Sequence, residues 1–137
     1  MSTFAALSIS GSGADAMQTW LDTAAGNVAN MNDVAAVGSR VYAQETPILQ
    51  AVAGPSAAGV ATQGVEVAKV ALGTSAGVLT YQPTSPLANG QGEVAVPNVT
   101  LAEQMVGMIS AEESYTADTT MMAKAQAVYG AALTIGV

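Results

Sequence analysis

The pattern of apolar and polar positions divides the chain into two helical ends and a different middle. From Phe4 to Met31 apolar residues return every three or four positions, which is typical of an amphipathic helix. From about Gly38 to Pro97 glycine and proline are frequent and the helical spacing is lost, whereas it returns after Asn98. The pattern predicts a mainly α-helical chain with a small β-rich insertion. The expected segments are residues 1–37, 38–97 and 98–137.

The N-terminal segment carries two adjacent apolar stripes that form one wide face. One consists of Phe4, Leu7, Ala14, Leu21 and Val28, and the other of Met17, Trp20, Ala24 and Met31. Gly11 and Gly13 each weaken a helix by about 1 kcal/mol relative to alanine. We therefore expect the firm helix to begin near Gly13 and the residues before it to depend on packing.

The insertion contains a candidate β-hairpin. Two β-rich runs, 65–72 and 78–82, flank the short glycine-bearing linker 73–77. Such an arrangement predicts two antiparallel strands joined by a turn.

Other parts of the insertion carry weaker signals. Residues 41–49 predict a strand, and Pro47 places it at a sheet edge. Residues 92–96 form a short extended stretch that Pro97 ends, and residues 54–59 predict a loop.

The C-terminal segment predicts a long helix. Asn98 can cap it, and Thr100 and Glu103 have the spacing of a capping box. Residues then step by three and four in a heptad rhythm, which predicts that the two terminal helices pair as a coiled-coil-like hairpin. A helix of about 35 residues would be about 50 Å long, and a lone hairpin of that shape has little core. Packing against other subunits is therefore expected. The heptad positions are Leu101, Met105, Met108, Glu112, Tyr115, Thr119, Met122, Gln126, Tyr129 and Leu133.

Composition supports an assembled state. Half of the residues are hydrophobic, but 4% are aromatic and 9% are charged, whereas an ordinary globular chain has about 25% charged residues. A surface so poor in charge is unusual for a free monomer, since charge of both signs keeps soluble proteins apart. We expect neighbouring subunits to cover much of it.

The charge balance excludes several partners. The formal net charge is −7, and Arg40, Lys69 and Lys124 are the only basic residues. Nucleic acid binding needs clustered lysine and arginine, so we expect no nucleic acid partner. Anionic membrane surfaces are disfavoured for the same reason. No apolar run is long enough to span a bilayer, and the first residues lack the charged and apolar regions of a cleaved signal peptide, so neither membrane insertion nor such a signal is expected.

Candidate chemistry is sparse, and we expect no catalytic residue, metal or cofactor. Cysteine and histidine are absent, which excludes disulfides, thiol catalysis and Cys/His zinc sites. The segment 11–16, GSGADA, has the spacing of a dinucleotide-binding motif but lacks the surrounding strands. The carboxylates of Glu112, Glu113 and Asp118 predict a solvated or interface-facing group more than an acid–base pair. Methionines at 105, 108, 121 and 122 predict adaptable packing rather than a soft-metal site.

Two asparagines at the end of the first helix allow two interpretations. Asn27 and Asn30 are three residues apart and share one helix face. They could terminate the helix, because asparagine tolerates the left-handed conformation of a C-cap. Alternatively, one amide could lie between the helices and penalise shifted registers.

The sequence resembles the bacterial flagellar rod and hook proteins. The N-terminal resemblance rests on residues 7–13 (LSISGSG), Leu21 and residues 27–30 (NVAN). The C-terminal half is similar to the proximal-rod, FlgC type of this family. That similarity lies in residues 64–67 (GVEV), 81–83 (YQP), 92–99 (GEVAVPNV), 103–106 (EQMV), 108–111 (MISA), Tyr115, Ala117 and 132–136 (ALTIG).

This resemblance implies a non-enzymatic subunit of the flagellar basal body. Such subunits are exported unfolded by the flagellar type III apparatus without a cleaved signal and assemble helically into the rod that crosses the periplasm, transmits torque and forms part of the export conduit. The implied partners are copies of the chain, other rod proteins, the inner-membrane ring and rod-adaptor proteins, and the export apparatus. Another helical secreted or surface assembly protein is the alternative, followed by a small soluble binding domain. The expected assembly interface comprises Leu7, Leu21, Asn27, Val28, Asn30, Met105, Met108, Ile109, Tyr115, Met122, Tyr129, Leu133 and Ile135.

Overall fold

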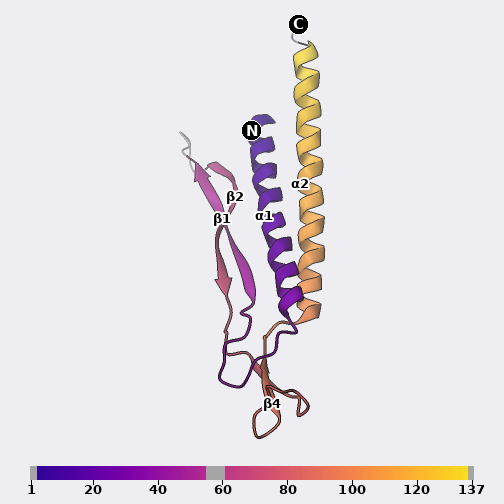
Figure 1. Ribbon diagram of the computed structural model, residues 1–137. Coiled ribbons are helices and arrows are strands. Elements are labelled where there is room, and N and C mark those ends of the chain that lie inside the picture. Colours follow the sequence, from indigo (N-terminus) through magenta and orange to yellow (C-terminus); the bar gives the residue numbers. More distant parts are fainter. Residues whose placement is uncertain (1–2, 55–60, 136–137) are drawn as a thin grey trace.

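Two long antiparallel helices form the body of the protein (Figure 1). The computed structural model describes residues 3–54 and 61–135. Helix α1 spans Thr3–Asn30 and helix α2 spans Leu101–Ile135. At about 1.5 Å per residue, α2 is about 10 Å longer than α1, and its C-terminal end extends past the beginning of α1 (Figure 1). The mainly helical fold class with a β insertion is confirmed.

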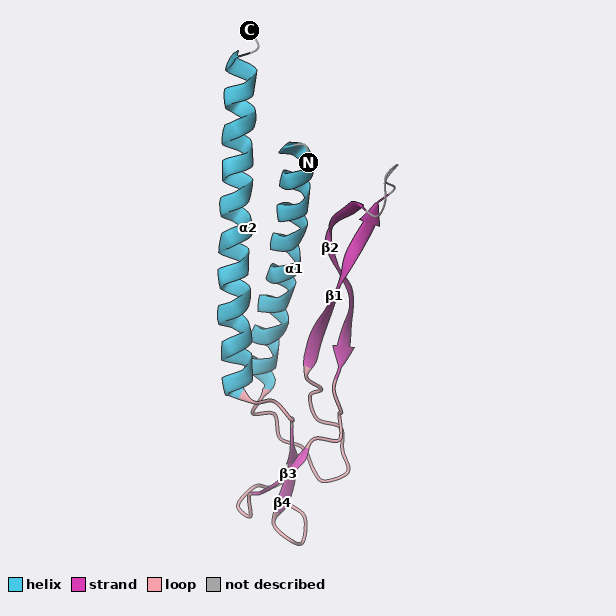
Figure 2. Cartoon of the chain, turned by 180° about the vertical axis from the view of Figure 1, so that it is seen from behind, coloured by secondary structure: helices cyan, strands magenta, loops and turns pink. Residues whose placement is uncertain are grey.

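The β region forms two separate antiparallel sheets of two strands each. Strand β1 (Glu45–Gly54) pairs with β2 (Ala61–Leu72) in a long ribbon that packs on α1. Strand β3 (Val78–Tyr81) pairs with β4 (Glu93–Val96) at the end of the molecule where α2 begins (Figure 2). Helix α1 therefore lies between α2 and the β1–β2 ribbon.

The predicted strands are partly confirmed. The extended stretch at 92–96 is β4, and the strand expected over 41–49 exists but begins at Glu45 and continues to Gly54. Pro47 pairs with Val70 in a sheet whose two strands are both edges. The loop predicted over 54–59 lies, apart from Gly54, outside the described residues.

The predicted hairpin over 65–82 is wrong. Both runs are strands, but β2 pairs with β1 and β3 pairs with β4. The linker contacts the segment before β1 instead of closing a turn, because Gly73 N donates to Gln44 O at 2.8 Å and Val41 N donates to Ser75 O at 2.9 Å. Gly77 has φ +70, and a Cβ at this position would overlap the carbonyl oxygen of Val96. The chain therefore crosses here from one sheet to the other.

Helix α1 begins ten residues earlier than the firm helix expected near Gly13, at Thr3. Packing in this region offsets the lower helix propensity of Gly11 and Gly13. The hydroxyl of Ser12 donates to Ile9 O at 2.8 Å and accepts from Val65 N of β2 at 3.1 Å. A Cβ at Gly13 would overlap the carboxylate of Asp118 on α2. The segment predicted to weaken the helix is thus the place where both β2 and α2 approach α1 closely.

The core within one chain is small. Its buried apolar side chains are mainly alanines, and the fully buried Val94 belongs to the small β3–β4 sheet. Large apolar side chains are instead widely exposed, most of all on α2. Among the residues whose burial the structure describes, the buried apolar ones are Ala14, Ala16, Ala24, Val41, Val94, Ala95 and Ala111.

The contact between the helices uses small and polar residues of α2. Gln104 and Ala111 are its buried residues, and α1 also approaches Gly107 through Trp20 and Asp118 through Gly13. We call this surface the α1–α2 seam. The predicted heptad positions differ, because Leu101, Met105, Tyr115 and Leu133 are exposed within the single chain while Met108 and Met122 are half-buried.

Candidate functional site: a buried asparagine junction and exposed helix faces

The side chain of Asn27 joins three parts of the fold. It is 1% exposed and lies near the end of α1. Its Nδ2 donates to Glu45 O at 2.8 Å and to Gln104 Oε1 at 2.9 Å. Its Oδ1 accepts from Tyr42 Oη at 3.0 Å and from Glu45 N at 2.8 Å. Both donors and both acceptor positions of the amide are therefore used.

These bonds fix one relative position of the elements. Glu45 is the first residue of β1, so two main-chain bonds hold the start of the ribbon to α1. Gln104 lies in the first turn of α2, so its side-chain bond holds the two helices together near their connected ends. Sliding either helix by one turn, about 5.4 Å, would break the bond to Gln104 and leave buried polar atoms unpaired.

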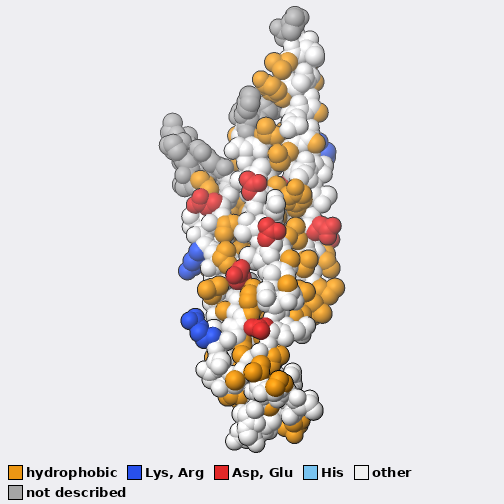
Figure 3. Space-filling view, viewed as in Figure 1, with side chains coloured by type: hydrophobic (Ala, Val, Ile, Leu, Met, Phe, Trp, Pro, Cys, Tyr) orange, Lys and Arg blue, Asp and Glu red, His pale blue; other side chains and the backbone are white. Residues whose placement is uncertain are grey.

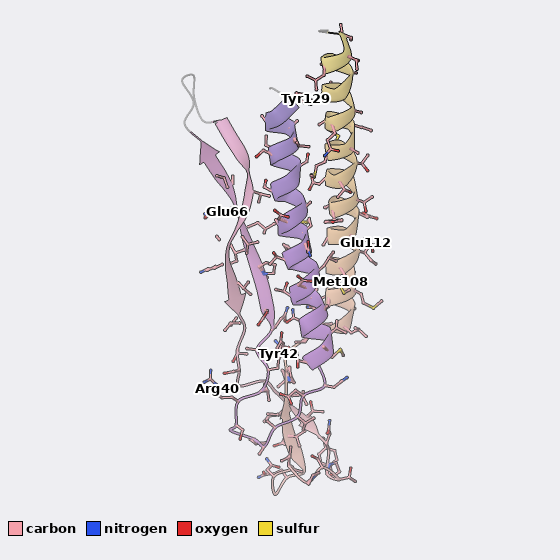
Figure 4. All side chains as sticks on the ribbon, turned by 45° about the horizontal axis from the view of Figure 1, so that its top comes forward. Arg40, Tyr42, Glu66, Met108, Glu112 and Tyr129 are labelled. Carbon is pink, nitrogen blue, oxygen red and sulfur yellow. The ribbon has the colours of Figure 1, made fainter. Side chains whose placement is uncertain are left out.

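Tyr42 completes the junction from the loop before β1 (Figure 4). Burial raises the pKa of its hydroxyl, and the negative charge of Glu45 adds to this effect. The hydroxyl is therefore held in the neutral form that can donate to Asn27.

Asn30 has a different environment. It is exposed, and its Nδ2 donates to Gly26 O of the same helix at 2.8 Å. Its main-chain oxygen accepts from Asp33 N at 3.1 Å, just past the helix end. Neither asparagine has a positive φ, so the left-handed C-cap is not formed. Asn30 bonds locally at the helix terminus, whereas Asn27 bonds between elements.

The other residues expected at an assembly interface occur in two environments. On α1, Leu7, Leu21 and Val28 are half-buried. Met108 and Met122 on α2 are half-buried as well. The remainder of the set is exposed on α2, and Figure 3 shows apolar side chains along this helix. These residues are Met105, Ile109, Tyr115, Tyr129, Leu133 and Ile135.

Sequence reasoning missed the partners of Asn27. Gln104 is not one of the predicted heptad positions, and Tyr42 lies in a region without helical periodicity. The sequence therefore does not predict that either residue contacts Asn27. The available signal was the pair of neutral polar residues, Asn27 and Gln104, within largely uncharged helices.

The alternative chemistries have no supporting geometry. The GSGADA segment lies inside α1 and does not form a strand-to-helix turn. Glu112 and Glu113 are exposed, and Glu112 points away from α1 (Figure 4). Within residues 3–54 and 61–135 no group of three acidic side chains is placed to hold a metal ion. No helix in the same ranges has the length and apolar character needed to cross a bilayer.

Comparisons with known proteins identify the family. Residues 91–135 match the family model for the C-terminal part of flagellar basal body rod FlgEFG proteins. A flagellar basal-body rod protein FlgC from Escherichia coli O6:H1 is 34% identical over 128 residues, which are 93% of each chain. The FlgC proteins of Yersinia enterocolitica and Bacillus subtilis are 32% and 33% identical over matches that cover 99% of each chain. This identity over almost the whole length shows that the chain belongs to the FlgC family of flagellar basal-body rod proteins.

Proposed function

We propose that this chain is a structural subunit of the proximal rod of the flagellar basal body and that it acts by assembly rather than catalysis. One observation carries the proposal. Large apolar side chains are exposed along the whole of α2, whereas the side chains buried within the chain are mainly alanines. Exposed apolar surface of this extent marks interaction sites.

The subunits assemble helically into a tube in which α1 and α2 form the inner layer and the β strands face outward. The elongated helix pair supports this arrangement, because it offers two long sides to neighbours (Figure 1). Coiled-coil-like packing between subunits would cover the heptad positions of α2 that are exposed in a single chain. The small number of charges favours such packing, since burying an unpaired charge is costly.

The partners follow from a place in the rod. They are copies of this chain, other flagellar rod proteins, the inner-membrane ring and rod-adaptor proteins, and the type III export apparatus that delivers the chain. The assembled rod crosses the periplasm, transmits torque and forms part of the export conduit.

Within the subunit, Asn27 sets the register of the helix pair and ties the ribbon to it. The four bonds of its amide support this role because they join α1, on which Asn27 lies, to α2, to β1 and to the loop before β1. A subunit with a single internal register presents the same outer surface at every position of a helical array.

Deletion of the gene tests the proposed function. Basal bodies isolated from the deletion strain and imaged by electron microscopy should contain rings but lack rod, hook and filament. The same strain carrying the wild-type gene on a plasmid is the control and should regain all three. A complete rod and hook in the deletion strain would contradict the proposal, provided that no second gene of this family is present.

A further inference from the structure

A cavity beside the Asn27 junction has room for a small ligand, and we call it the junction cavity. It lies between α1, the start of β1 and the first two turns of α2, and its volume is about 170 Å³. An engineered cavity of about 150 Å³ in another protein takes up benzene, so a ligand of about six heavy atoms fits here. Thr46 and Glu103 line the cavity and are exposed, so a ligand can enter from solvent.

Two N–H donors of the cavity wall are unpaired. Gln104 is only 7% exposed, and its Oε1 accepts from Asn27 Nδ2. Its Nε2 and the indole Nε1 of Trp20 have no acceptor within residues 3–54 and 61–135. Across the same ranges no fully enclosed side-chain nitrogen or oxygen lacks a partner, so the Nε2 of Gln104 is reached from the cavity that this residue lines. Free donors of this kind favour a ligand that offers an acceptor oxygen.

The charged groups of the cavity wall are both carboxylates. Glu45 and Glu103 line the cavity, whereas the basic residues Arg40, Lys69 and Lys124 do not. Two negative charges around one small cavity favour a cation, because opposite charges attract more strongly where protein replaces part of the water. A ligand complementary to this wall therefore combines a positive charge with an acceptor oxygen.

We propose that the junction cavity binds an α-aminoacyl group, in which a primary ammonium stands next to a carbonyl. The ammonium faces the carboxylates of Glu45 and Glu103. The carbonyl oxygen accepts from Gln104 Nε2 and Trp20 Nε1. A single carbon atom separates the two groups, so both fit into the small volume. The inference goes beyond the proposed rod function and does not depend on it.

This chemistry has two sources, an amino-acid amide and the N-terminus of a polypeptide. A free amino acid is disfavoured, because its own carboxylate would be repelled by the two glutamates of the wall. Capture of an N-terminal amine by a built protein site is a known mode of peptide recognition. The probes below separate these sources.

Fluorescence titration of the full-length chain tests the site, because Trp20 is the single tryptophan and lines the cavity. Alaninamide carries both the ammonium and the carbonyl and should change the emission saturably. N-Acetylalaninamide lacks the charge and ethylammonium lacks the carbonyl, and each should bind at least about tenfold more weakly, since hydrogen bonds of charged groups are the strong ones. No binding, or equal binding of the three probes, would overturn the proposal.

A charge-removing variant tests the wall itself. Glu103→Gln keeps the size of the side chain and should weaken alaninamide binding about threefold, as expected for one exposed charge of a pair. Glu113→Gln is the matched control, because it makes the same change at an exposed position of α2 that does not line the cavity. Equal affinities of the two variants would contradict the role of the carboxylates.

The amide of the tripeptide Ala-Ala-Ala identifies the source. Binding within about threefold of alaninamide supports the N-terminus of a polypeptide, because the rest of the peptide then leaves through the open side of the cavity. Binding more than about tenfold weaker supports a free amino-acid amide, because the cavity then encloses the whole ligand.

A second measurement applies where the isolated chain shows no urea-induced transition. The amide of photoleucine, whose side chain carries a photoreactive diazirine, is irradiated with purified rods, and the labelled peptides are mapped by mass spectrometry. Peptides that contain residues 44–47 or 103–107 should carry more label than with the N-acetylated probe, and equal labelling by the two probes would overturn the site. Absence of the wild-type chain from purified rods would overturn the rod function and leave binding by the isolated chain standing.

Discussion

Replacing Asn27 by leucine removes all four bonds of the buried junction while keeping the branching and the number of heavy atoms of the side chain. The bond to Gln104 is buried, so the unpaired amide oxygen costs about 1–3 kcal/mol. The three bonds to Tyr42 and Glu45 are partly exposed, and each contributes about 1 kcal/mol. The loss of about 4–6 kcal/mol is offset by about 2 kcal/mol from burying the leucine side chain. We expect a net destabilisation of about 3 kcal/mol, a large part of the roughly 5–15 kcal/mol that stabilises an ordinary domain.

Asn30→Leu is the matched control. It makes the same chemical change three residues away, where the amide is exposed and bonds within its own helix. Its expected effect is below about 0.5 kcal/mol.

Urea unfolding followed by tryptophan fluorescence measures both variants. Trp20 is the single tryptophan of the chain and lines, with Asn27, a cavity of about 170 Å³, so its emission reports on the junction. Swimming in soft agar by the complemented deletion strain gives the functional readout, and Asn27→Leu should swim less. If the free energies of unfolding of the two variants agree within about 0.5 kcal/mol, the reasoning about Asn27 is refuted.

Three further predictions concern other parts of the chain. Gly77→Ala should destabilise the protein by at least about 2 kcal/mol in the same urea assay, because positive φ disfavours alanine and the added Cβ would overlap main-chain atoms. At Gly90 an added Cβ meets open space, so Gly90→Ala should change the free energy of unfolding by under about 1 kcal/mol. Similar values for the two variants would contradict this reasoning. The pKa of Tyr42 is raised above the value of about 10 of an unfolded tyrosine. The contribution of its neutral hydroxyl to the free energy of unfolding is therefore complete below pH about 10 and is lost as the pH rises through the folded pKa. Unfolding measured as a function of pH should show no such loss for Tyr42→Phe. Truncation after Gly130 should abolish motility while leaving the helical circular dichroism of the rest of the chain largely intact, and normal swimming would exclude a role for Leu133 and Ile135 in assembly.

The sequence predicts the helices well because each is long and contains no proline. It does not predict the strand pairing. The runs around residues 73–77 look like a hairpin locally, but bonds from Gly73 and Ser75 to the segment 41–44 decide the pairing, and these join residues about 30 positions apart. Local patterns carry no information about such long-range contacts.

The sequence predicts Asn27 as a candidate site residue but does not predict its partners, because these are also distant in the chain. Asn27 stands out as an amide in an apolar helix, but its partners come from the other helix and from a loop. The heptad pattern followed the large apolar residues of α2, whereas the seam is formed by Gln104, Gly107 and Ala111, which allow close approach. Periodicity shows that a face is suited to burial and does not show which neighbour buries it.

The small residues of the seam have a mechanical consequence. Alanine and glycine have no side-chain torsions, so the contact cannot yield to a force by changing rotamers. A load along the helices must be borne by the main-chain hydrogen bonds within each helix, by the bond from Asn27 to Gln104 and by the close contact of Gly13 with Asp118. Close-packed interiors have low compressibility, and a pair of helices packed in this way should bend and twist as one stiff beam.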